Sequence, residues 1–157
     1  REEVFLTLHT RSLVRWSHIL TDHLSIGMTD HAYASAFYKT AMADRTFVPL
    51  LIRLEHVIEH NVAIESLIES KRIFIGRVDC IAEQTATVLN LTRSQSSEVV
   101  KTMGVLLVGA TSTDQGPSLE GEAIPPDVQE LIDSFSSEIL FIKNACRIIV
   151  GIRTGVS

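Results

Sequence analysis

The sequence predicts an all-α protein, a single-domain antiparallel bundle of five or six helices over residues 1–157, and three observations support this fold class. Apolar residues recur with a helical period in six segments. No segment sustains the alternation of a half-buried strand, and Gly/Asn hairpin turns are missing. Most connections between the segments are short, which favours antiparallel neighbours.

Composition limits the classes of function. The chain has 157 residues, of which 45% are hydrophobic and 21% charged, so it can bury a core without a disulfide or a metal. Its net charge of −5 has the wrong sign for binding phosphates, so we expect no nucleic-acid partner. Cys80 and Cys146 are expected to be buried free thiols. No signal peptide is recognisable at the start, which predicts a cytoplasmic protein.

Residues 44–70 form the stretch around which the bundle is expected to pack. Their apolar residues share an arc roughly 140° wide on a helix that starts near Thr46, with Asp44 as its N-cap. Asn61 and Glu65 fall inside this apolar arc. Either the helix breaks near Asn61 or a hydrogen-bonded polar pair is buried. The average helix length favours the break.

Two helices are predicted before this stretch, at residues 2–24 and 31–43, and Thr29 or Asp30 is the expected N-cap of the second. His9 and His23 lie on the apolar side of the first helix. A histidine in that position is usually a core residue whose ring bonds a backbone carbonyl, and a heme or metal ligand is the alternative.

After the central stretch, helices are predicted at residues 73–91 and 98–110. Ser94 or Ser96, followed by Glu98, indicates a loose capping box at the start of the second of them. The end of that helix is apolar on all sides, which predicts deep burial.

Residues 111–126 are predicted to be a flexible surface loop because they contain two glycines, three prolines and small polar residues. One last helix then starts at about Pro126 and is apolar around its circumference from Ile139 onward. It is expected to occupy the centre of the core or to form an association surface. The candidate partner-binding residues are Leu140, Phe141, Ile148 and Ile152.

His56, Glu59 and His60 match the HxxEH pattern and resemble, over five residues, the inverted zinc peptidases. The resemblance implies that both histidines bind zinc and that Glu59 acts as the base. No third ligand is identifiable, and the helical wheel places both histidines opposite the core. A solvated surface patch is therefore the expected outcome, and a metal-dependent enzyme is the third of three functional hypotheses.

No nucleophile motif, phosphate loop or dinucleotide fingerprint is present, so we predict no catalytic activity and no cofactor. The first hypothesis is a protein-interaction, scaffold or adaptor domain whose partner is another protein or a second copy of the chain. The second is the binding of an apolar small molecule, lipid-like or heme-like, between helices near Met103, Phe135 and Phe141. No segment is long and apolar enough to predict a membrane span.

Overall fold

The computed structural model describes residues 1–155, and the described residues are helical with no strand among them, which confirms the all-α fold class. They form seven α-helices: α1 (Glu2–His23), α2 (Asp30–Ala43), α3 (Phe47–Arg53), α4 (Ile64–Leu89), α5 (Arg93–Ser112), α6 (Pro126–Ser134) and α7 (Ser137–Thr154). Three single turns of other helix types complete the described secondary structure: Leu54–Ile58, Glu59–Asn61 and Thr113–Gln115.

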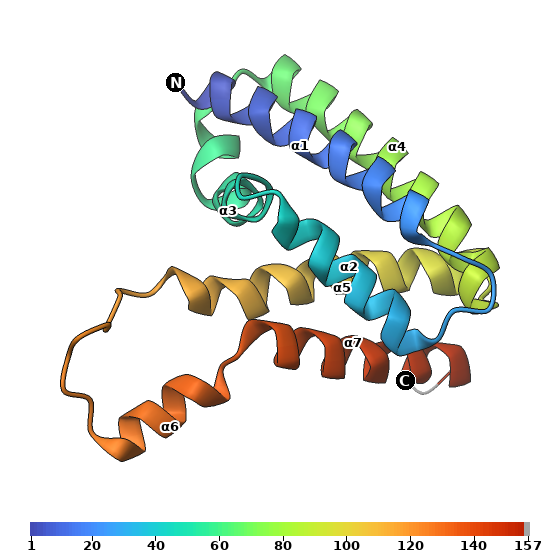
Figure 1. The fold of residues 1–157 in the computed structure, drawn as a ribbon. Helices are drawn as coiled ribbons and strands as arrows, with labels where there is room; N and C mark the ends of the chain where they lie inside the picture. Colours follow the sequence, from blue (N-terminus) through green and yellow to red (C-terminus); the bar gives the residue numbers. More distant parts are fainter. Residues whose placement is uncertain (156–157) are drawn as a thin grey trace.

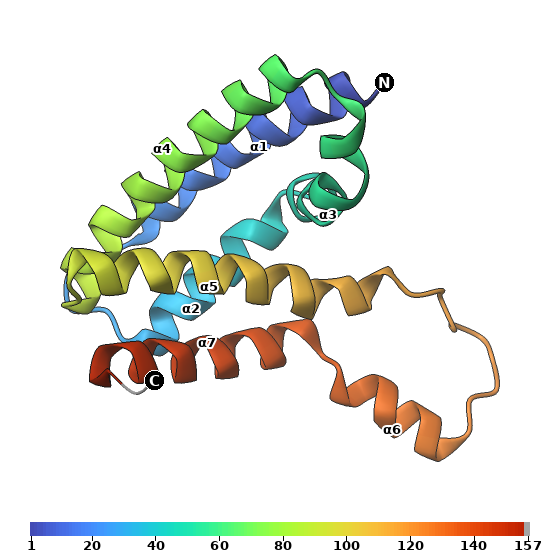
Figure 2. The same ribbon diagram turned by 180° about the vertical axis from the view of Figure 1, so that it is seen from behind.

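The helices pack in two pairs that diverge from a common corner, one parallel (α1 and α4) and one antiparallel (α5 and α7) (Figure 1). Helices α1 and α4 lie side by side, α5 and α7 form a second pair, and α2 packs against α7 (Figure 1). The chain reverses between α4 and α5 at Asn90, whose left-handed backbone (φ 53°, ψ 54°) ends α4. From that turn α4 and α5 spread apart, with α3 on the open side between them (Figure 2).

The core is centred on aromatic side chains from four helices. The ring of Trp16 stacks on Phe47 and meets Phe37 edge to face, both at 5.0 Å between centroids. Phe37 stacks in turn on Phe141 at 5.7 Å, and Tyr38 lies 5.5 Å from Phe141. Aromatic rings bury more area than other side chains, so this cluster ties α1, α2, α3 and α7 into one core.

The predicted starts of the second and third helices are close to those observed. Thr29 caps α2, and its hydroxyl accepts a hydrogen bond from the Ala32 amide at 3.0 Å. The N-cap of α3 is Thr46, so the prediction that Asp44 is the N-cap was wrong. Asp44 instead accepts hydrogen bonds from the Thr46 amide at 2.9 Å and hydroxyl at 2.7 Å, which fixes the turn before α3.

The capping box of α5 lies earlier than expected. Thr92 accepts from the Gln95 amide at 3.1 Å, and the Gln95 side chain accepts from the Thr92 amide at 3.0 Å. The prediction of a box formed by Ser94 or Ser96 with Glu98 was therefore wrong. Ser96 is buried and donates to a carbonyl of α4 instead, because the helix already has its cap.

The predicted break near Asn61 is confirmed. Helix α3 ends at Arg53 and continues as the π-helical turn Leu54–Ile58 and the 3₁₀ turn Glu59–Asn61, and α4 starts at Ile64. Asn61 and Glu65 are both exposed, so the alternative of a buried polar pair is wrong. Asn61 donates to the Val57 carbonyl at 2.7 Å, which satisfies one backbone acceptor where the helix ends.

The predicted last helix is divided in two. Its first part, α6, projects from the body together with the preceding loop (Figure 1), and none of the nine described residues of α6 is buried. The helix stops at Phe135, and Ser137 starts α7 with its hydroxyl 2.7 Å from that of Tyr38. The predicted loop at residues 111–126 is shorter, because α5 and a 3₁₀ turn extend to Gln115.

Candidate functional site

A cavity of about 370 Å³ lies between α1, α2, α3, α4 and α5. Its lining is mostly apolar and comes from five helices and the π-helical turn. This volume lies within the usual range for small-molecule sites in proteins. The lining residues are Leu13, Trp16, Phe37, Phe47, Leu51, Ile52, Leu54, His56, Lys71, Phe74, Val78, Ile81, Val100, Lys101, Gly104, Val105, Leu107 and Val108.

The cavity exists because of local sequence features at the divergence of α4 and α5. Gly104 lines it from α5, and no neighbouring atom lies within 4 Å of the place where a Cβ would stand. The regular helix of α3 ends at Arg53, and Leu54 and His56 of the π-helical turn continue the lining. The missing side chain at Gly104 therefore leaves space that the surrounding core does not fill.

The floor of the cavity offers no free hydrogen-bonding side chain among the described residues. Its buried members are aliphatic or aromatic, and the one polar atom among them is Trp16 Nε1. That nitrogen already donates to the Thr40 hydroxyl at 3.0 Å. Whatever occupies the floor must therefore be apolar, because a buried polar group without a partner is costly.

The mouth is defined by the lining residues that are exposed to solvent, which are His56, Lys71, Lys101 and Val105. Lys71 forms an ion pair with Glu59, which does not line the cavity. Lys101 forms no ion pair with any residue the structure describes. None of the described lining residues is acidic, so the ionisable side chains that line the mouth are all basic.

His9 lies next to the lining residue Phe47. Its side chain is 1% exposed, and its ring stacks on that of Phe47 with 6.3 Å between the ring centroids. Neither ring nitrogen has a hydrogen-bond partner among the described residues. Burial, with a smaller contribution from the positive charge of Lys71 that Glu59 partly offsets, lowers its pKa from 6.5 to about 4. His9 is thus a core histidine as predicted, but the expected bond to a carbonyl is absent. His23 is exposed and contacts the Ile19 carbonyl at 2.7 Å.

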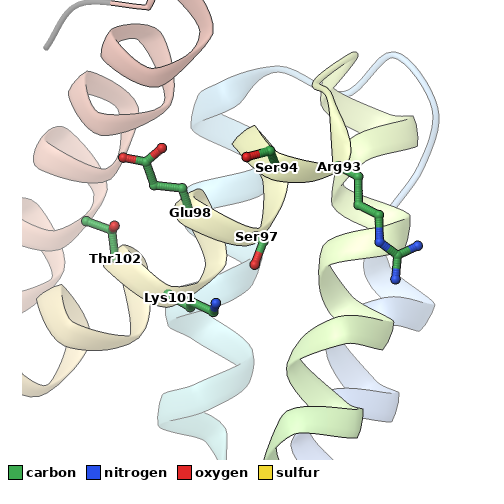
Figure 3. Close-up of a pocket in the computed structure, with 6 residues that line it drawn as sticks. All are labelled: Arg93, Ser94, Ser97, Glu98, Lys101 and Thr102. Carbon is green, nitrogen blue, oxygen red and sulfur yellow. The ribbon is translucent and has the colours of Figure 1, made fainter.

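A second, broader depression lies on the surface of α5 and shares Lys101 with the mouth of the cavity (Figure 3). All of its lining residues belong to this one helix, and their side chains point in different directions (Figure 3). A single helix face cannot surround a ligand, so this depression is part of the open surface. The lining residues are Arg93, Ser94, Ser97, Glu98, Lys101 and Thr102.

The structure does not build the zinc site that the HxxEH resemblance implied. His56 and His60 are exposed as predicted, and Glu59 pairs with Lys71. The three residues lie across a π-helical turn and a 3₁₀ turn, so the regular helical spacing of the two histidines is lost. Among the described residues, no three potential ligands gather in a group that could hold a metal ion.

The candidate association residues on the final helix have different surroundings. Phe141 is fully buried in the aromatic core, so its assignment to a surface was wrong. Leu140, Ile148 and Ile152 are half-buried on α7, and they stay candidates for a partner surface.

The residues suggested for an apolar ligand do not line the cavity. Met103 and Phe141 fill the core, and Phe135 is 49% exposed at the end of α6. Trp16 and Phe47 line the cavity but were not predicted as ligand-site residues, because their apolar character indicated only a continuous core. A glycine within an apolar helix, Gly104, was the available signal for a cavity.

The part of the chain that holds the cavity matches a known family. The sequence model described as "Tetracyclin repressor-like, C-terminal domain" matches residues 10–129, a segment that contains every lining residue of the cavity. A search of curated proteins found no match. No described helix combines the length and apolar character that crossing a lipid bilayer requires.

Proposed function

We propose, because this chain belongs to the family of tetracyclin repressor-like C-terminal domains, that its cavity binds an apolar small molecule. Domains of this family are helical ligand-binding and dimerisation domains of regulators. The observation that carries the proposal is the cavity itself, with its buried apolar floor and exposed mouth. The sequence alone favoured protein interaction over ligand binding, and the cavity reverses that order.

The floor can hold an apolar ligand tightly enough for regulation. Burying apolar surface contributes about 25 cal/mol per Å², and small ligands gain at most about 1.5 kcal/mol per non-hydrogen atom. The aromatic walls formed by Trp16, Phe37 and Phe47 are held by core packing, so little entropy is lost when a ligand enters. Largely preformed apolar sites of this kind are typical of small-molecule binding.

Two glycine substitutions on α5 test the cavity. Gly104 lines it and Gly109 does not, and neither position has a neighbouring atom within 4 Å of the place where a Cβ would stand. Gly104→Leu should fill the cavity and abolish the binding of an apolar probe molecule such as decan-1-ol, whereas Gly109→Leu should leave the binding of that probe unchanged. Trp16 is the single tryptophan and lines the cavity, so its fluorescence reports occupancy. Equal binding by both variants would place the ligand elsewhere.

We also propose that a second copy of the chain packs on α6 and the adjacent part of α7. Val128, Leu131, Ile132 and Phe135 follow one another at helical spacing, and all are at least 40% exposed. A nine-residue helix is too short to be stable alone in water, so this apolar face needs a partner. Ile139, 67% exposed, extends the face onto α7.

Sedimentation analysis tests this association. Leu131→Glu should convert a dimer to a monomer, because it places a charge in the buried centre of the contact. Gln129→Glu changes an exposed residue of the same helix by the same charge and should leave the dimer intact. A wild-type chain that sediments as a monomer at micromolar concentration would refute the proposal. We further propose a cytoplasmic location, which the unpaired Cys80 and Cys146 support.

A further inference from the structure

We propose that the ligand of the cavity is an apolar carboxylic acid, with its chain on the aromatic floor and its carboxylate at the mouth beside Lys101 and Lys71. This inference rests on the proposed function, because it names the class of molecule that the same cavity takes. It follows from the distribution of polarity within the site, which assigns the two ends of the ligand separately.

The floor determines the apolar end. The described buried lining residues provide no free donor or acceptor side chain, since Trp16 Nε1 already donates a hydrogen bond to the Thr40 hydroxyl. A polar group placed there would lose its water without gaining a partner. Any polar group on the ligand must therefore stay at the mouth.

The mouth determines the sign of the polar end. His56, Lys71 and Lys101 are three of the four exposed lining residues, and all three are basic. Glu59 balances part of the charge of Lys71, and Lys101 forms no ion pair with a described residue. A carboxylate gains attraction here, a hydroxyl gains little, and a quaternary ammonium is repelled.

The volume sets the approximate size. The cavity of about 370 Å³ corresponds to about a dozen water molecules at about 30 Å³ each. A ligand with about that many non-hydrogen atoms fills it, and decanoic acid is a suitable probe. Decan-1-ol and decyltrimethylammonium carry the same chain with a neutral and a positive head.

Titration of the full chain with these three probes, followed by Trp16 fluorescence and calorimetry, tests the inference. We expect decanoate to bind at least about fivefold more tightly than decan-1-ol, and the ammonium to bind most weakly. Equal affinities, or tighter binding of the ammonium, would overturn the carboxylate assignment while leaving the cavity as an apolar site. Failure of all three probes to bind would instead refute the proposed function.

Lysine variants locate the carboxylate. Lys101→Met keeps the apolar stem and removes the charge, and it should reduce the preference for decanoate over decan-1-ol to about twofold or less. Lys71→Met should weaken the preference less, because Glu59 already offsets that charge. Lys143→Met, on the exposed surface of α7, makes the same change in net charge outside the cavity and should keep the full preference. An unchanged preference in both Lys101→Met and Lys71→Met would overturn the placement at the mouth.

Discussion

Acidification should destabilise this protein through a single buried side chain, His9. Its ring is 1% exposed and neither nitrogen has a hydrogen-bond partner among the described residues. Burial, together with the positive charge of Lys71, lowers the pKa of His9 from 6.5 to about 4. The folded state therefore excludes a proton that the unfolded chain accepts.

The sign and the size of the effect follow from this pKa difference. The contribution to stability is fully present above pH 6.5, the unfolded pKa, and it is lost progressively as the pH falls from 6.5 to about 4. One pKa unit corresponds to about 1.4 kcal/mol, so the complete loss is about 3 kcal/mol. Between pH 7.5 and pH 5 the free energy of unfolding should fall by about 2 kcal/mol.

Urea unfolding at a series of pH values, followed by far-ultraviolet circular dichroism, measures this loss. His9→Leu removes the titrating ring and should flatten the profile between pH 5 and pH 7.5. The variant should be nearly as stable as the wild type at pH 7.5, because the lost ring nitrogens make no hydrogen bond with any described residue. Asp44 titrates separately, since its pKa is lowered to about 2 and its contribution is lost only below pH 3.8.

A matched control separates His9 from the exposed histidines. His31→Leu changes a solvent-facing residue of α2 and should retain the full pH dependence. If the wild-type profile is flat from pH 7.5 to pH 5, or if His9→Leu retains the slope, the assignment of the acid sensitivity to this buried ring is wrong.

Three further predictions concern the core and the loop. Tyr33→Phe and Thr85→Val should each cost about 1–3 kcal/mol, because their hydroxyls bond each other at 2.6 Å in a fully buried pair; the double variant should cost less than the sum when measured by urea unfolding. Phe141→Ala should cost about 3–5 kcal/mol in the same assay, and a loss below about 1 kcal/mol would contradict its place at the centre of the aromatic core. Limited proteolysis should cut first within residues 116–125, which lie exposed between helices, and earlier cleavage within α3 would contradict this.

The sequence was sufficient to predict the helices whose apolar stripe faces one core. Residues 2–24 were predicted as a helix and α1 spans Glu2–His23, because a 3.6-residue period is visible without knowledge of any partner. The break near Asn61 was predictable for the same reason, since two polar residues interrupted the stripe. The π-helical turn that forms there was not, because it depends on contacts with α1 that no local pattern encodes.

The division of the last helix shows where a periodic pattern misleads. The apolar residues Val128, Leu131 and Phe135 continue smoothly into Ile139, so one helix was predicted. The body instead buries a different line on α7, formed by Phe141, Ala145 and Ile149. The chain turns between Phe135 and Ser137 to present that line to the core, and the first stripe is left exposed on α6.

Gly104 is the one local signal for the cavity in the sequence, and the other parts of the cavity have ordinary explanations in their own helices. Lys71 lies on the polar face of α4, and Lys101 lies on the polar face of α5. Charged side chains are expected at both positions. Gly104 destabilises its helix by about 1 kcal/mol relative to Ala, and nothing else on that helix explains why a glycine stands there. Only the divergence of α4 and α5 places the glycine over open space and brings both lysines to one mouth. The positions of helix axes, and not the residues on any one helix, thus determine which polar residues can meet a ligand.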